Sequence, residues 1–162
     1  MFHPRQIAAI LAVLITVPAA AQLPTRHILP VAVARQMADV AQTHCAEMGY
    51  SISVHVVDIA GDTLVAYRGE GSGVHTFINS YRKAYTAMTF NRPSAEFNER
   101  LEQGDIGTQL QLMLPDISGQ QGGLPIRVGE EVIGGIGASG GGMGSDTVCV
   151  QAGIDAVAAE LQ

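Results

Sequence analysis

The chain has 162 residues and a formal net charge of −6 at pH 7, with 15 acidic against 9 basic residues. This acidic balance argues against binding to nucleic acid or to an anionic membrane surface. The first 21 residues combine a basic start, an uninterrupted apolar run and a small-residue A-x-A ending, a pattern typical of a secretory signal peptide cleaved before Gln22. We therefore expect residues 22–162 to form a single exported domain, periplasmic or secreted, without a membrane anchor.

The first half of this domain is predicted to form a helix followed by a β-hairpin. Apolar residues recur at helical spacing over residues 31–48, a segment that starts after Pro30 and ends at Gly49. Apolar and polar residues then alternate over 51–68, on both sides of the turn Ala60-Gly61-Asp62, and this pattern predicts two antiparallel strands.

The second half is predicted to contain two helices, a weakly patterned connection, two strands and a last helix. These elements are the helices 74–90 and 94–102, the connection 103–122, the strands 122–128 and 130–139, and the helix 147–161. Ser94 and Asp146 are expected to cap the helices that follow them. The order α-β-β-α-α-β-β-α pairs the strands through tight hairpins. It predicts an α/β protein of the α+β class, in which helices flank an antiparallel sheet.

A glycine-rich stretch, IGGIGASGGGMGSD at residues 133–146, precedes the last helix. It matches the dinucleotide pattern G-x-G-x-x-G, but no later strand remains to carry the acidic residue that such a site needs. It also matches the nucleophile pattern G-x-S-x-G at Ser139, yet all five histidines precede that serine and its strand belongs to a hairpin. We interpret the stretch mainly as a tight passage from strand to helix, whose N–H groups can also receive an anion.

The two cysteines, Cys45 and Cys149, would meet an oxidising compartment after export. A disulfide between them is one interpretation, and two separate buried thiols are the other. The sequence leaves this choice open.

The chain resembles a known family in four sequence blocks. These are VVDIAGDTLVAYRGEGSG, YRKAYTAMTFNRPSAEF, GGLPI, and VIGGIGASGG followed by D, C and QAG. From about Leu29 to the end of the last helix, the chain is similar to the GlcG/HbpS-like haem-binding proteins, and most of all to their secreted HbpS branch. The resemblance implies a five-stranded antiparallel sheet of profilin-like layout, dimers that build rings or octamers, and haem as ligand. It also implies a sensor kinase as partner, and a periplasmic enzyme is the alternative partner that we consider.

Haem needs an axial donor for its iron, cations or N–H groups for its propionates, and an apolar slot. The predicted helix 74–90 carries side chains of all three kinds. We take its first imidazole as the candidate iron ligand and its two cations as candidate partners of the propionates. The candidate haem-binding residues are His75, Tyr81, Arg82, Lys83, Thr86 and, as a competitor for the iron, His27. Residues at this spacing are otherwise typical of a core or of a solvated helix face.

These observations favour an exported haem-binding protein that carries, stores or senses haem and performs no catalysis. One alternative is a cofactor-free regulatory or accessory subunit of a periplasmic enzyme or sensor. A weaker alternative is a small hydrolase that uses Ser139. The sequence contains no coherent set of base, nucleophile and orienting residue, and this absence argues against the hydrolase.

Overall fold

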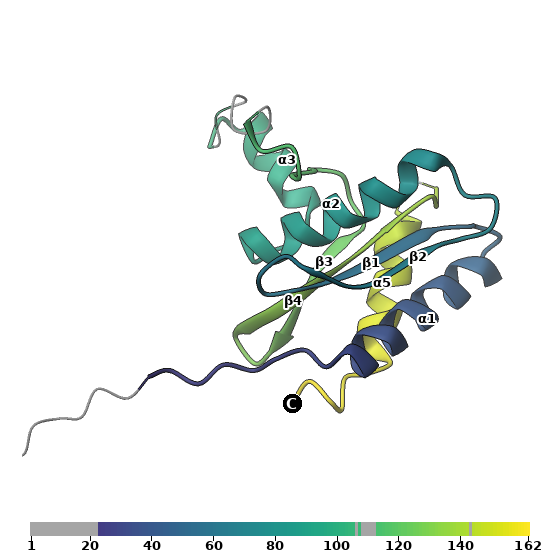
Figure 1. The fold of residues 1–162 in the computed structure, drawn as a ribbon. Helices are drawn as coiled ribbons and strands as arrows, with labels where there is room; N and C mark the ends of the chain where they lie inside the picture. The colour runs from purple at the N-terminus through teal and green to yellow at the C-terminus, as the bar shows by residue number, and fades with distance from the viewer. Residues whose placement is uncertain (1–22, 106, 108–112, 143) are drawn as a thin grey trace, which may run out of the picture.

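The computed structural model describes residues 23–105, 107, 113–142 and 144–162. Its elements in chain order are α1 (Val31–Glu47), β1 (Ser53–Asp58), β2 (Thr63–Arg68), α2 (Val74–Phe90), α3 (Ala95–Glu102), β3 (Gly123–Val128), β4 (Glu131–Ser139) and α5 (Ser145–Asp155). Helix α2 covers one face of the sheet, and α1 and α5 lie side by side on the other face (Figure 1). No helix in these ranges has the length and apolar character needed to cross a membrane. The predicted signal peptide lies outside the described residues.

The sheet contains four antiparallel strands in the order β2-β1-β4-β3, which confirms the predicted class of fold. The expectation of five strands is wrong for the described part of the chain. Only four stretches of the sequence have a strand pattern, and the segment 23–30 before α1 forms no strand. That segment is held instead by Leu29, which is 2% exposed and belongs to the core.

The main core lies between the sheet and the pair α1 and α5. Val54 and Val56 of β1 and Ile136 of β4 point to this side and are fully buried. Because side chains alternate along a strand, the residues between them face α2 on the other side. The two central strands, β1 and β4, therefore pack against α2 with one face and against α1 and α5 with the other.

The face of β4 beneath α2 is built from glycines. A Cβ atom at Gly137 would collide with the carbonyl oxygen of Ser80, and one at Gly135 would collide with that of Ala84. Glycine at both positions lets the backbone of α2 lie directly against the backbone of the strand. The first half of the glycine-rich stretch therefore allows close packing between α2 and the sheet.

The prediction that Ser94 and Asp146 cap the helices that follow them is wrong. The Ser94 hydroxyl makes no cap bond. It donates to the carbonyl of Gln120 at 2.5 Å and accepts from the N–H of Gly123 at 3.0 Å, so it ties the start of α3 to β3. Asp146 lies in the first turn of α5 and makes no cap bond either, because Lys83 and the preceding loop occupy its carboxylate.

His55 of β1 faces α2 and is buried with a neutral imidazole. Its Nδ1 lies 2.8 Å from the Ser80 hydroxyl, which in turn donates to the carbonyl of Phe77 at 2.8 Å. Since the serine proton is already used, Nδ1 of the histidine is the donor in the first bond. Burial lowers the pKa of His55 to about 4.

We predict that replacing Gly137 by alanine destabilises the fold by about 3 kcal/mol, because α2 must move away from β4 to admit a methyl group. Urea denaturation followed by circular dichroism measures the change. Gly107→Ala is the matched control, since a Cβ atom at Gly107 meets nothing within 4 Å. Equal stability of the two variants would contradict the packing account.

We also predict an acid-sensitive contribution from His55. Its folded-state pKa lies below the unfolded value, so the unfolded chain binds the proton first and stability falls as the pH drops from 6.5 towards 4. The wild type should therefore lose about 2 kcal/mol more than His55→Gln between pH 7 and pH 4.5. Urea denaturation at the two pH values measures this difference, and parallel losses in both proteins would refute it.

Candidate functional site

A cleft of about 1240 Å³ opens beside α2. One wall is the side of α2 that carries His75, Asn79 and Arg82. The turns 49–51 and 71–73 form a second wall, the segment 117–121 forms a third, and the glycine loop 139–142 closes the floor. All of these segments except α2 are connections between elements, as is common for binding sites on a rigid scaffold.

The floor of the cleft contains a buried ion pair. The Nζ atom of Lys83 lies 2.8 Å from Oδ2 of Asp146 and 2.9 Å from the carbonyl oxygen of Ala138. The two charged side chains are only 3% and 4% exposed. In so dry an environment each charge requires the other, because removing one partner would leave an uncompensated charge.

Asp146 also holds the glycine loop. Its Oδ1 accepts the N–H of Gly141 at 2.8 Å, while the hydroxyl of Ser145 donates to the carbonyl of Gly142 at 2.7 Å. Gly140 has a φ of 127°, which favours glycine over any other residue. The loop between β4 and α5 is thus fixed to the first turn of α5.

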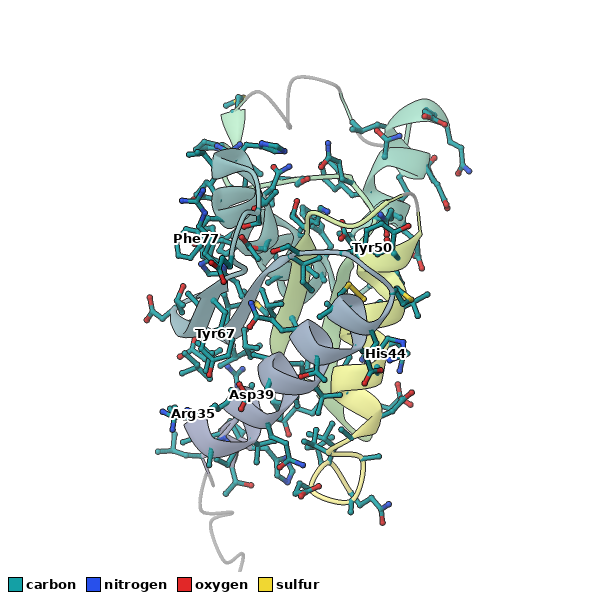
Figure 2. All side chains as sticks on the ribbon, turned by 90° about the vertical axis from the view of Figure 1, so that its right-hand side faces the viewer. Arg35, Asp39, His44, Tyr50, Tyr67 and Phe77 are labelled. Carbon is teal, nitrogen blue, oxygen red and sulfur yellow. A yellow bond between two sulfur atoms is a disulfide. The ribbon has the colours of Figure 1, made fainter. Side chains whose placement is uncertain are left out.

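A disulfide anchors α5 to the rest of the fold. Cys45 near the end of α1 and Cys149 in α5 are joined by a disulfide bond (Figure 2), which settles the choice that the sequence left open. Their Cα atoms are 5.5 Å apart. Both cysteines are fully buried. Such a crosslink stabilises a fold by up to about 4–5 kcal/mol for a loop of this length. It joins the helix that carries Asp146 to the helix that precedes Tyr50, a residue of the second wall.

The third wall is attached to α2 and α5. The N–H of Ser118 donates to the Thr86 hydroxyl at 2.8 Å. The side-chain oxygen of Gln121 accepts from the hydroxyl of Thr147 at 2.7 Å. The cleft is therefore bounded by segments that hydrogen bonds and a covalent bond hold in place.

Three of the predicted haem-binding residues line this cleft together, namely His75, Arg82 and Lys83. His75 is exposed at the start of α2. Arg82 is half-buried, and its enclosed Nε atom has no hydrogen-bond partner among the described residues. Lys83 is already neutralised by Asp146, so Arg82 is the cation whose charge is available to a ligand.

Tyr81 and Thr86 do not line the cleft. The ring of Tyr81 packs 5.8 Å from those of His55 and Tyr85, and burial raises the pKa of its hydroxyl. The hydroxyl of Thr86 is buried, donates to the carbonyl of Arg82 and accepts from the N–H of Ser118. Both residues support the walls and neither faces the cleft.

His27 lies at the opposite end of β4. Its Nδ1 is 2.6 Å from Oε2 of Glu131, the first residue of that strand, whereas the cleft contains Ser139, the last one. The hydrogen bond from His27 lowers the pKa of Glu131. Within one protomer, His27 is therefore not part of the cleft.

Sequence reasoning missed Asp146 and Tyr50 as residues of the site. Asp146 was interpreted as a helix cap, a local role, whereas its partner Lys83 lies 63 positions earlier. Tyr50 follows α1 and carries no motif. An aspartate directly after a glycine-rich loop was the one available signal, because such loops often bind ligands.

The cleft fits a haem at its polar groups. His75 offers an imidazole for iron, and Arg82 offers the positive charge of its guanidinium for a propionate. The lining is otherwise rich in serine, glycine and glutamine, with Ile117 and Tyr50 as its apolar surfaces. Ile78, one turn beyond His75, is 46% exposed and extends the apolar surface of the same helix.

A family model described as haem degrading protein HbpS-like matches residues 29–155. The chain therefore belongs to the HbpS-like family, which is described by its action on haem. The match covers the whole sheet and every helix given above, together with all the walls of the cleft.

Solved structures share this fold. The protein ORFY of Klebsiella pneumoniae superposes with a TM-score of 0.80 at 28% identity, over 87% of this chain and 99% of that one. HbpS gives a TM-score of 0.76 at 32% identity, over 85% and 97%. PduOC, solved as a haem complex, gives 0.75 at 22% identity, over 80% and 95%, and this last likeness concerns the fold alone.

We predict that Lys83→Met destabilises the protein by about 3–5 kcal/mol, because Asp146 then remains buried without a counter-charge. The double variant Lys83→Met with Asp146→Leu should recover much of that loss, since it buries no charge. Chemical denaturation of the three proteins at pH 7 measures this. A single variant as stable as the wild type would contradict the account of the cleft floor.

Proposed function

We propose that this protein binds haem in the cleft beside α2 and that it carries, stores or senses haem after export. The main observation behind this proposal is that α2 brings the exposed imidazole of His75 and the guanidinium of Arg82 to one wall of a cleft of about 1240 Å³. Membership of the HbpS-like family supports the choice of haem as ligand. A solved haem complex of the fold relative PduOC is consistent with it.

The spacing of the two side chains suits a ligand with two polar ends. His75 and Arg82 are seven positions apart, about two helical turns, so they share one side of α2 at roughly 10 Å along its axis. A haem bound through its iron at His75 would direct its propionates towards Arg82. Bound haem would supply redox or gas-binding chemistry, while the chain's own residues orient the macrocycle and limit its contact with water.

Exposed apolar residues on α2 support an assembly of several copies. Val74 is 79% exposed, Ile78 46% and Phe77 39%, and the three residues lie at helical spacing on α2. We include a homo-oligomer in the proposal, dimer-based and as large as an octamer. A sensor kinase or a periplasmic enzyme is the proposed further partner.

The test is a titration of the disulfide-bonded protein, residues 22–162, with hemin, followed by absorbance. We expect a saturable Soret band at a stoichiometry of one haem per chain. His75→Ala should weaken binding at least tenfold and change the spectrum, because the iron loses its axial imidazole. His44→Ala is the matched control, since His44 lies on α1 and does not line the cleft.

Two results would overturn the proposal. The first is the absence of a saturable band in the wild type. The second is an unchanged spectrum and affinity in His75→Ala together with a loss in His27→Ala, which would move the ligand to the other end of β4.

A further inference from the structure

The last residue of β4 presents an unused hydroxyl to the cleft. Ser139 lines the cleft floor and is 5% exposed. Its hydroxyl has no hydrogen-bond partner among the residues that the structure describes. A hydroxyl that the protein leaves free at the floor of a cleft can donate a hydrogen bond to a ligand atom.

A second donor lies in the same floor. The ammonium group of Lys83 has three protons. Two of them are donated to the Ala138 carbonyl and to Asp146. The third has no acceptor within the described ranges, although Lys83 is 2% exposed and lines the cleft.

The charge of the cleft selects the ligand. Arg82 and Lys83 are the two cations of its lining, and Asp146 is the single acid among the described lining residues, which leaves a net charge of +1. The chain as a whole carries −6. The N-terminus of α5, an 11-residue helix, adds a partial positive charge at the glycine loop.

We propose that the floor of the cleft is an oxyanion subsite that receives a carboxylate. The Ser139 hydroxyl and the third proton of Lys83 donate to the carboxylate oxygens, and Arg82 contributes its charge from the neighbouring wall. Asp146 holds the ammonium group of Lys83 in place at 2.8 Å, so it is a positioning residue. The carboxylate belongs either to a haem propionate or to a small free carboxylic acid. The first case rests on the function proposed above.

The first arm of the test compares hemin with its dimethyl ester, whose propionates carry no charge. Ser139→Ala should lower the affinity for hemin about tenfold and leave that for the ester unchanged, because a hydrogen bond to a charged group is lost. Ser51→Ala is the matched control, since Ser51 lines the same cleft but its hydroxyl already donates to the Glu70 carbonyl at 2.6 Å. Far-ultraviolet circular dichroism verifies that each variant is folded.

The second arm uses the haem-free protein and compares propionate with its uncharged analogue propionamide, by amide chemical shifts in NMR. Saturable shifts with propionate alone, at least tenfold weaker in Ser139→Ala, support the subsite and identify a free acid as a sufficient ligand. If hemin fails to bind but this result is obtained, the haem proposal falls and the subsite stands. If hemin and its ester bind both variants equally and propionate causes no shift, the subsite is overturned and the haem proposal stands.

Discussion

The direct contact between the backbones of α2 and β4 is the constraint on which the rest of this structure depends. Glycines 135 and 137 remove the side chains that would separate helix from strand. Only at that short distance can Lys83 reach the carbonyl of Ala138 and the carboxylate of Asp146. The position of α2 then decides which of its sides is buried and which one becomes a wall of the cleft.

The cleft is preorganised by contacts that do not involve a ligand. The disulfide holds α5 against α1, Asp146 fixes the glycine loop, and Thr86 binds the segment opposite. Fixed donors bind a charged ligand more tightly than mobile ones, because less conformational entropy is lost. The residues at the floor of the cleft therefore stabilise the fold and would also hold the proposed ligand, whereas His75 and Arg82 at the rim would serve binding alone.

Patterns between near neighbours in the sequence predicted most of the fold. Alternation over 51–68 and helical spacing over 74–90 located strands and helices within a residue or two, because they reflect which side of each element is buried. His75, Arg82 and Lys83 were found together since residues seven or eight apart share a helix face, whereas Tyr81 lies on another side of that helix. The partner of Asp146 was not predictable, because a buried cation 63 positions away leaves no local signal. The expectation of a fifth strand followed from the family resemblance alone, and no strand pattern in the sequence supported it.

The central claim is that the ligand lies in the cleft beside α2, and ferric haem offers a direct test because its unpaired electrons broaden nearby NMR signals. The measurement is the loss of amide signals from the isotope-labelled protein at one equivalent of hemin. The account predicts broadening at Asn79, Arg82 and Gly140 in the cleft, with sharp signals at the β3–β4 turn around Gly129. Broadening centred on that turn and on Glu131, with the cleft unaffected, would contradict it.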